Sequence, residues 1–358
     1  MGILDIETMN AVRAALNEID PTILVYGEGW TGGDSALNAS LRAMKVNTYK
    51  MENVGAFSDD IRDGIKGSVF DAADQGFVTG KSGQEERIKS GIIGATDYVG
   101  INWAATGTDV GDSWTNSPVQ AINYVSCHDN LTLWDKINSS NADDTLEDRV
   151  KMNNLCASIV YTAQGIPFML SGEEILRTKP NESGTGFDHN SYKSSDYTNS
   201  IKWDTLNDET TASVLEYYKG LIAFRKAHSG LRMTTAEDVN NNLSFLEVKD
   251  ENVVAYVIEN SPNGETAEKI CVIYNANKEA VKVTVPEGEW KVCIKNDKAG
   301  TETIETIEGT EVTVDAISCL AMIQEAEATF PWIPVMIAVV AVIIVAAIAL
   351  IVVKKVKK

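Results

Sequence analysis

Basic residues are scarce in this chain. Its 358 residues include 31 Lys and Arg but 51 Asp and Glu, which gives a formal net charge of −20. A protein that binds nucleic acid needs Lys and Arg to neutralise the phosphates, so this composition argues against a nucleic-acid partner. An uncharged substrate remains compatible with such an acidic surface.

Cysteine is also scarce, and the cysteines form no recognisable pattern. The five are Cys127, Cys156, Cys271, Cys293 and Cys319. No pair has the spacing of a metal site, and the count is odd, so we expect most of them to be reduced and buried. Cys271 and Cys293 fall in one β-rich region, which leaves a disulfide between them open. The cysteines therefore indicate no metal site.

Charged residues are absent from one long segment. Residues 330–353 are 24 consecutive positions without Asp, Glu, Lys or Arg. A helix of this length rises about 36 Å at about 1.5 Å per residue, enough to cross a hydrocarbon core of roughly 30 Å. We therefore predict a transmembrane anchor at 330–353. A buried core helix is the alternative, but such helices seldom lack a polar face over this length.

Four lysines lie in the tail that follows this segment, residues 354–358. Basic residues next to a membrane span favour the cytoplasmic side. We predict a single-pass protein of the cell membrane, with the tail in the cytoplasm and the preceding part extracellular. A cell-wall sorting signal also ends in this way, but its Leu-Pro-x-Thr-Gly motif is not found upstream of this segment.

The first part of the chain alternates helical and strand patterns. Apolar residues recur at helical spacing in 6–19, 146–163 and 214–227. Short, mostly apolar runs, typical of buried parallel strands, are 22–26, 54–58, 121–126 and 166–170. This order predicts an α/β fold with a parallel sheet over residues 1–235.

The pattern changes after about residue 236 to short β-type runs separated by turn signals. The runs are 243–248, 253–258, 270–274, 281–285, 289–294 and 311–314. They predict an all-β sandwich or barrel over residues 236–325.

Polar residues stand where the predicted parallel strands end. Glu28 follows one strand, between two glycines and before Trp30, and Asp129 follows another, between His128 and Asn130. Active sites of parallel barrels lie at the carboxyl ends of the strands, and two carboxyl groups are what glycoside hydrolysis requires. A structural alternative stays open, in which Glu28 caps a helix and Asp129 makes a turn.

Other titratable residues in this part have structural explanations. Glu173 and Glu174 also follow a predicted strand, but a helix cap or a salt bridge explains them better. His189 and His228 have no partner pattern, so we interpret them as surface or packing residues.

Four motifs resemble type I pullulanases, the debranching branch of the α-amylase family of glycoside hydrolases. They are Ile23-Leu-Val-Tyr-Gly-Glu-Gly-Trp, Tyr124-Val-Ser-Cys-His-Asp-Asn-Leu-Thr-Leu-Trp-Asp, Gln164-Gly-Ile-Pro-Phe-Met-Leu-Ser-Gly-Glu-Glu and Asn190-Ser-Tyr-Lys-Ser-Ser-Asp-Tyr-Thr-Asn-Ser-Ile-Lys-Trp. In order, they resemble the region of the general acid, the region of a His-Asp pair, the last barrel strand and the loop after it. The resemblance runs from Met1 to about Ile323. Most pullulanases carry Lys where this chain has Cys127.

The resemblance implies the fold class. We expect the C-terminal half of a (β/α)8 TIM barrel at 1–235, an all-β sandwich domain at 236–325 and a C-terminal transmembrane helix.

The resemblance also implies roles for individual residues. Glu28 would be the general acid/base, and Asp129 would stabilise the transition state. The residues that it assigns to substrate binding are His128, Trp30, Asn130, Tyr192 and Asp196. For Tyr192 and Asp196, a structural role in their loop fits equally well.

The implied activity is hydrolysis of α-1,6-glucosidic links in pullulan, starch or glycogen by a retaining double displacement. The partner would be an α-glucan polysaccharide. Family members often hold Ca²⁺, but no ligands and no cofactor can be assigned from this sequence. Two alternatives stay open: another glucan hydrolase of the α-amylase family, and a non-catalytic surface protein that binds glucans.

The nucleophile of the family is an Asp in a segment reading Arg-Phe-Asp-Leu-Met-Gly. The first residues of this chain continue that segment, so the nucleophile would precede Met1. Asp5 and Glu7 come too late to replace it. We therefore expect the chain to be a fragment that is inactive alone, because a retaining glycosidase needs two carboxyl groups about 5–5.5 Å apart.

Overall fold

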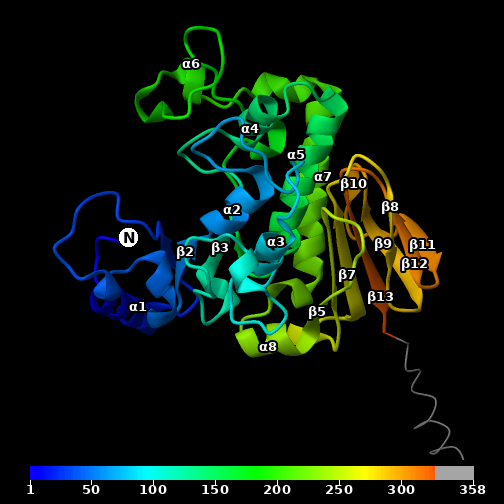
Figure 1. Ribbon diagram of the computed structural model, residues 1–358, viewed down its shortest axis with the longest axis horizontal. Coiled ribbons are helices and arrows are strands. Elements are labelled where there is room, and N and C mark those ends of the chain that lie inside the picture. Colours follow the sequence, from blue (N-terminus) through cyan, green and yellow to red (C-terminus); the bar gives the residue numbers. More distant parts are fainter. Residues whose placement is uncertain (327–358) are drawn as a thin grey trace, which may run out of the picture. The chain divides into compact units, whose positions relative to one another are not determined.

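The computed structural model describes residues 1–326, of which residues 1–325 form one compact unit (Figure 1). Its α-helices are α1 Ile6–Ile19, α2 Asp59–Lys66, α3 Glu85–Ile92, α4 Leu133–Ser140, α5 Leu146–Thr162, α6 Asp196–Asn199, α7 Glu209–Ala227 and α8 Ala236–Asn242. Its strands are β1 Val25–Gly27, β2 Val54–Phe57, β3 Ala121–Asn123, β4 Ile166–Pro167, β5 Leu243–Phe245, β6 Val253–Ile258, β7 Ala267–Asn275, β8 Val281–Thr284, β9 Glu289–Lys295, β10 Lys298–Ala299, β11 Glu305–Glu308, β12 Glu311–Val314 and β13 Ser318–Glu325.

The first four strands form a parallel sheet in the order β1-β2-β3-β4. Tyr26 of β1 pairs with Gly55 of β2, and Ala56 of β2 pairs with Ala121 of β3. Ile122 pairs in turn with Ile166 of β4. Each strand lies within or beside a predicted apolar run but is shorter than that run. All four carboxyl ends therefore face the same edge of the sheet.

Side-chain caps fix where the long helices begin. Asp5 accepts a hydrogen bond from the backbone N–H of Thr8 at 2.7 Å, so α1 starts at Ile6, as its pattern predicts. Thr145 caps α5 in the same way. Asp208 caps α7, which begins at Glu209, five residues before the predicted start at 214. Such caps satisfy backbone donors that have no partner within the helix.

The C-terminal strands form the predicted sandwich. A seven-stranded antiparallel sheet has the order β10-β9-β13-β7-β6-β5, with β11 also paired to β9, and β8 and β12 form a second, two-stranded sheet. Strand β6 contributes side chains to a hydrophobic core on each side of the large sheet. Val253 and Val257 pack toward the two-stranded sheet, whereas Val254 and Tyr256 pack with the helices. Alternate residues of a strand face opposite sides, so both sides of the sheet are covered.

Strand β13 is the one central strand that the sequence pattern does not predict. It pairs with β7 on one side and with β9 on the other. Residues on both of its faces are buried, including Leu320, Ala321 and Met322. The apolar residues 319–323 do not alternate with polar ones, so a period of two does not reveal the strand, although the apolar run itself, like that of β6, could have predicted it.

The helices α5 and α7 lie between the parallel sheet and the sandwich (Figure 1). Buried tyrosines of the sandwich bind α5: Tyr256 donates to the carbonyl of Thr162 at 2.7 Å, and the Tyr274 and Thr162 hydroxyls are hydrogen-bonded. Arg225 of α7 donates to the carbonyls of Ala163 at 2.7 Å and Gly165 at 2.6 Å, just before β4. The sandwich thus braces the segment from which β4 starts.

Beyond α7, a buried ion pair joins this region to the sandwich. The Nδ1 atom of His228 lies 3.2 Å from Glu265 Oε1, and their side chains are 8% and 1% exposed. Burial alone would raise the pKa of Glu265, but hydrogen bonds from His228, Ala267 N and Gly230 N outweigh it and lower the pKa to about 2. His228 is therefore a packing residue with a specific partner.

The predicted fold class needs a correction at its C-terminal end. Within residues 1–326, none of the helices is both long and apolar enough to cross a membrane. The predicted span, 330–353, lies outside the residues that the structure describes. The fold of residues 1–326 therefore contains no transmembrane helix. Hydropathy measures only how apolar a segment is, and it does not establish a helix. The predicted cellular location depends on that helix and stays a prediction.

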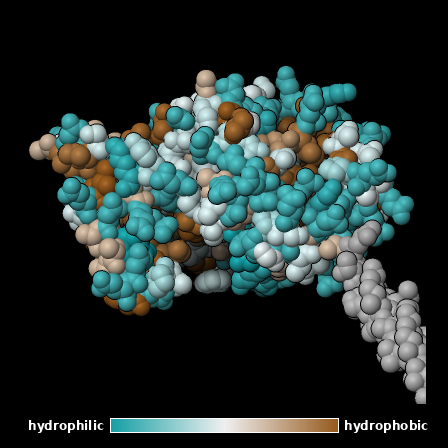
Figure 2. All heavy atoms as spheres, turned by 90° about the horizontal axis from the view of Figure 1, so that it is seen from below, coloured by the Kyte–Doolittle hydropathy of each residue, from teal (hydrophilic) through white to brown (hydrophobic). Residues whose placement is uncertain are grey.

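Figure 2 shows a face on which hydrophilic residues predominate and hydrophobic residues form separate patches. Several exposed apolar side chains belong to the first 24 residues, namely Ile3, Leu4, Val12, Ile19 and Leu24.

The Glu265 ion pair makes the first testable prediction. Because the pKa of Glu265 falls from 4.5 to about 2 on folding, the carboxylate contributes about 3 kcal/mol at neutral pH. This stabilisation is fully present above about pH 4.5 and is lost as the pH falls toward 2. In urea unfolding, Glu265→Gln should lower the free energy of unfolding most at pH 7 and much less at pH 3. Glu268→Gln, at an exposed position, is the control. A Glu265→Gln effect of equal size at both pH values would contradict this account.

Candidate active site

A cavity of about 430 Å³ lies at the carboxyl edge of the parallel sheet. Glu28 follows β1 directly, Asp59 comes two residues after β2, and residues 126–130 follow β3. All of them line the cavity. The strand ends therefore converge on one site, as the sequence predicts for Glu28 and Asp129.

Glu28 and Asp129 both face the imidazole of His128. His128 Nε2 lies 3.5 Å from Glu28 Oε1 and 3.6 Å from Asp129 Oδ2. These three atoms all lie within 4.8 Å of one another. The side chains are 37% exposed for Glu28, 66% for His128 and 61% for Asp129. Two carboxyl groups thus reach the same small volume from two strands, and both can contact a ligand there.

The loop after β3 turns sharply at Asn130. Its φ of 62° is left-handed, a conformation that Asn tolerates better than most residues. Before the turn, Cys127 Sγ lies 3.2 Å from His128 Nδ1. Burial raises the pKa of the Cys127 thiol, so this pair lacks the thiolate of a cysteine nucleophile. All five cysteines are free, so Cys271 and Cys293 form no disulfide.

The structure divides the predicted substrate-binding residues into two groups. Trp30 and Asn130 line the cavity with His128. Tyr192 and Asp196 do not line it. Tyr192 is 72% exposed on the short 3₁₀ helix Ser191–Lys193, and Asp196 is exposed at the start of α6, in a projecting segment (Figure 1).

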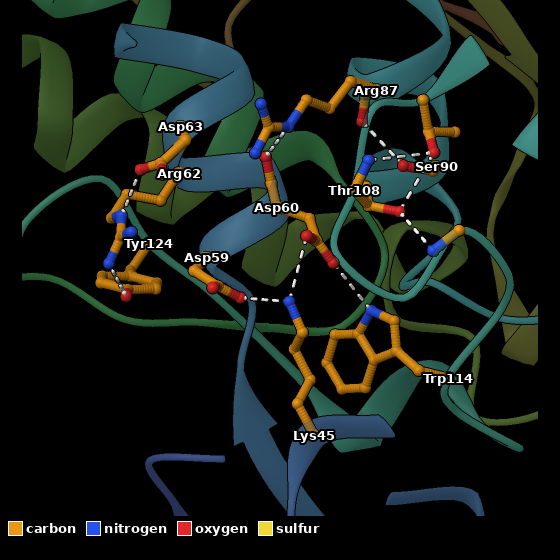
Figure 3. Close-up of polar contacts among 12 residues, drawn as sticks. Lys45, Asp59, Asp60, Arg62, Asp63, Arg87, Ser90, Thr108, Trp114 and Tyr124 are labelled. Atoms are coloured by element: carbon orange, nitrogen blue, oxygen red, sulfur yellow. Dashed lines mark hydrogen bonds and ion pairs between the residues drawn. The ribbon is translucent and has the colours of Figure 1, made fainter. Parts of the chain in front are cut away.

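Asp59 is a cavity residue that the sequence argument missed. Its carboxylate Oδ1 lies 2.5 Å from Lys45 Nζ, and Lys45 also binds Asp60 Oδ1 at 3.0 Å (Figure 3). Trp114 Nε1 donates to the other oxygen of Asp60 at 3.1 Å. Asp59 comes just after a predicted strand, so the rule that singled out Glu28 could have found it.

Burial and charge oppose each other at Lys45. Burial alone would lower the pKa of Lys45, but the charges of Asp60 and Asp59 outweigh it and raise the pKa above its ordinary value. Lys45 therefore stays charged and holds Asp59 at the cavity wall.

Arg62, three residues after Asp59 on α2, fixes a neighbouring part of the wall. Its Nε donates to Asp63 Oδ1 at 2.6 Å, and its Nη1 donates to the Tyr124 hydroxyl at 2.8 Å (Figure 3). Tyr124 also lines the cavity, and its ring packs edge-on against Phe57 of β2. The cavity thus combines aromatic faces with charged groups, as sites that bind sugars do.

One cluster of the described residues could hold a metal ion: Glu28, His128 and Asp129. An imidazole with two carboxylates suits Zn²⁺ better than Ca²⁺, which prefers six to eight oxygen ligands. The cluster does not match the Ca²⁺ that the family resemblance implies, so no role is derived for that ion.

Comparison with known proteins points to one family. Residues 239–298 match the family model "Pullulanase, all-beta domain". The chain is 33% identical over 286 residues to the pullulanase of Bacillus subtilis (strain 168), covering 80% of this chain and 37% of that protein. The solved pullulanase from Bacillus acidopullulyticus superposes with a TM-score of 0.80 at 37% identity, over 90% of this chain and 37% of that one.

This chain is a relative of the pullulanases. Similarity extends to the pullulanase of Paenibacillus barengoltzii, solved with maltohexaose and alpha-cyclodextrin, with a TM-score of 0.78 at 36% identity over 91% of this chain and 47% of that one. Pullulanases are glycoside hydrolases. The chain spans 37% of the length of the Bacillus subtilis pullulanase, so the activity of a whole pullulanase is a proposal for it.

The buried lysine beside the cavity makes the second prediction. Lys45→Met would leave Asp59 and Asp60 without their counter-ion, and losing one partner of a buried pair costs about 3–5 kcal/mol. We expect a loss of that size in the free energy of unfolding, measured in urea at pH 7.

The matched control is Lys226→Met at an exposed position of α7. Its effect should stay within about 0.5 kcal/mol. Equal effects of the two substitutions would show that the Lys45 ion pairs are not structural.

Proposed function

We propose that this chain carries the acid and the sugar-binding residues of an α-glucan hydrolase. The observation that supports it is the arrangement of Glu28 and Asp129 around His128, after strands β1 and β3 of a pullulanase-like fold. The substrate class is supported by relatives solved with maltooligosaccharides.

In the proposed reaction, Glu28 protonates the oxygen of the glycosidic bond as it breaks. Positive charge then develops on the sugar ring, and Asp129 stabilises it through its negative charge and hydrogen bonds to the ring hydroxyls. His128, between the two carboxylates, binds the same sugar. Trp30 offers an apolar face beside it. Glu28 then acts as the base that activates water in the second step.

The retaining mechanism needs a carboxylate that attacks the sugar. A carboxylate oxygen of Glu28 lies within 4.8 Å of one of Asp129, and the carboxyl groups of retaining enzymes are roughly 5–5.5 Å apart. Distance alone thus permits Asp129 as the nucleophile. The family motif assigns Asp129 to stabilisation instead, and our proposal places the attacking carboxylate outside these 358 residues. Trapping the intermediate with a fluorinated glycosyl fluoride and mapping the labelled peptide would separate the two, since labelling of Asp129 contradicts the proposal.

The proposed bond specificity is for α-1,6 links, in line with the pullulanase relatives. The gene product that contains these residues should release reducing sugar from pullulan faster than from linear amylose. Faster release from amylose would indicate the α-1,4 activity that stays open. Binding of glucan without hydrolysis of either would indicate a binding protein.

Replacing the proposed acid makes the third prediction. Glu28→Gln keeps the size of the side chain but removes its proton, and general acid catalysis contributes about 10²–10⁴-fold. In the gene product that contains these residues, we expect the kcat on pullulan to fall by that factor with little change in KM. Glu216→Gln, a 70% exposed glutamate of α7, should leave both constants unchanged. A fall of less than about threefold for Glu28→Gln would refute the assignment.

Sugar stacking makes the fourth prediction, which needs no turnover. Trp30 is 38% exposed at the cavity, and removing its ring should cost about 1.4 kcal/mol of affinity, about tenfold in Kd. Titration calorimetry of the 358-residue chain with maltotetraose measures this for Trp30→Ala. The control is Trp203→Ala, since Trp203 is 62% exposed away from the cavity. Equal affinities of the Trp30 and Trp203 variants would contradict the proposed position of the sugar.

A further inference from the structure

The segment that follows β4 touches the loop that carries His128 and Asp129. Glu173, in the 3₁₀ helix Glu173–Ile175, accepts a hydrogen bond from the Ser126 hydroxyl at 2.5 Å and one from the Tyr218 hydroxyl at 3.1 Å. The residue is only 5% exposed. The sequence favours a helix cap or a salt bridge for Glu173, but its partners are two hydroxyls. Within residues 1–326, no cationic nitrogen lies within 4.0 Å of its carboxylate.

A second contact lies a few residues further along the same segment. Lys179 Nζ donates to the backbone carbonyl of His128 at 3.1 Å. Lys179 is 2% exposed, and its backbone N–H donates to Asp135 Oδ2 at 2.8 Å. The other oxygen of Asp135 accepts from the Thr178 hydroxyl at 2.5 Å. Asp135 is itself fully buried, so it holds the backbone of Lys179 in a fixed position.

We propose that residues 173–179 act as a clamp that holds the loop 126–130 at two points, so that His128 and Asp129 face Glu28. The inference rests on the function proposed for those residues. Glu173 holds the loop at Ser126 and Lys179 holds it at the His128 carbonyl. Neither Glu173 nor Lys179 lines the cavity, so both are positioning residues that act through the loop.

The loop needs such anchoring because its functional side chains are the exposed ones. His128 and Asp129 are 66% and 61% exposed, so their own packing does not fix them. Ser126, by contrast, is buried, and its hydroxyl is the first of the two anchored points in the loop that follows β3. A shift at Ser126 would therefore move the imidazole relative to Glu28.

The electrostatic state of Glu173 is consistent with this role. Burial raises the pKa of Glu173 to about 7, while the hydrogen bonds from Ser126 and Tyr218 oppose that rise by favouring the carboxylate. Only the ionised form can accept from both hydroxyls without giving up an oxygen to its own proton. Replacing it with an amide removes one of the two acceptors.

The test compares two adjacent, isosteric substitutions. Glu173→Gln removes one acceptor of the clamp. Glu174→Gln removes the same charge one residue away, where the side chain accepts only from the backbone N–H of Gly172. The readout is the imidazole NMR signals of the 358-residue chain, which has only three histidines. Affinity for maltotetraose is measured on the same samples.

We expect Glu173→Gln to shift the His128 signal and to weaken maltotetraose binding at least fivefold. The signals of His189 and His228 should stay in place, and Glu174→Gln should change neither readout. An unmoved His128 signal in a folded Glu173→Gln protein overturns the clamp.

Ser126→Ala removes the same contact from the other side and keeps the buried carboxylate. It decides the question if Glu173→Gln fails to fold, since an unmoved His128 signal in Ser126→Ala also overturns the clamp.

Failure of the proposed function would give a different result. The unmodified chain would then not bind maltotetraose, while the His128 signal would still report on the clamp.

Discussion

The parallel alignment of four short strands is the constraint on which this site depends. Strands of three, four, three and two residues carry little stability of their own, yet their register places every carboxyl end at one edge. Glu28, Asp59 and the loop 126–130 meet there only because the strands run in the same direction. An antiparallel neighbour would send its loop to the opposite edge.

Such short strands must be held by what surrounds them, and helices α5 and α7 do most of this. The residues of α5 from Met152 to Thr162 are all buried, and the C-terminal end of the helix accepts a hydrogen bond from Tyr256 of the sandwich. Arg225 of α7 binds the carbonyls just before β4, and Tyr218 of the same helix reaches Glu173 just after it. The sandwich therefore supports the segment before β4 through α5, although no sandwich residue lines the cavity.

The site also depends on ionisable groups that are buried beside the cavity. Three buried ionisable groups lie close to the cavity. Lys45 binds two aspartates, Asp135 accepts a hydrogen bond from the backbone of Lys179, and Glu173 accepts one from Ser126. Desolvation makes such groups expensive, so each is stable only with well-placed partners. The benefit is geometric. An ionised group that must keep its partners holds the nearby backbone in one position, and exposed side chains such as His128 can then be placed without packing of their own.

Local signals along the chain determined much of this protein. The 3.6-residue period and the Asp5 cap define α1 as observed, and the apolar runs locate the parallel strands. Polar residues after those runs identify Glu28 and Asp129, and the motifs around them identify the relatives. These features are local, because they depend on residues a few positions apart.

Only the tertiary structure decided the rest. It placed Tyr192 and Asp196 away from the cavity, and it added Asp59 by way of Lys45, fourteen residues before it. It also inserted β13 between two strands that precede it, and it replaced an expected cap or salt bridge at Glu173 with two distant hydroxyls. Each of these outcomes depends on which distant segments meet, and neither periodicity nor hydropathy records that. The physical reason is that a pattern along the chain reports how a segment is buried, whereas contacts across the fold decide which groups it is buried against.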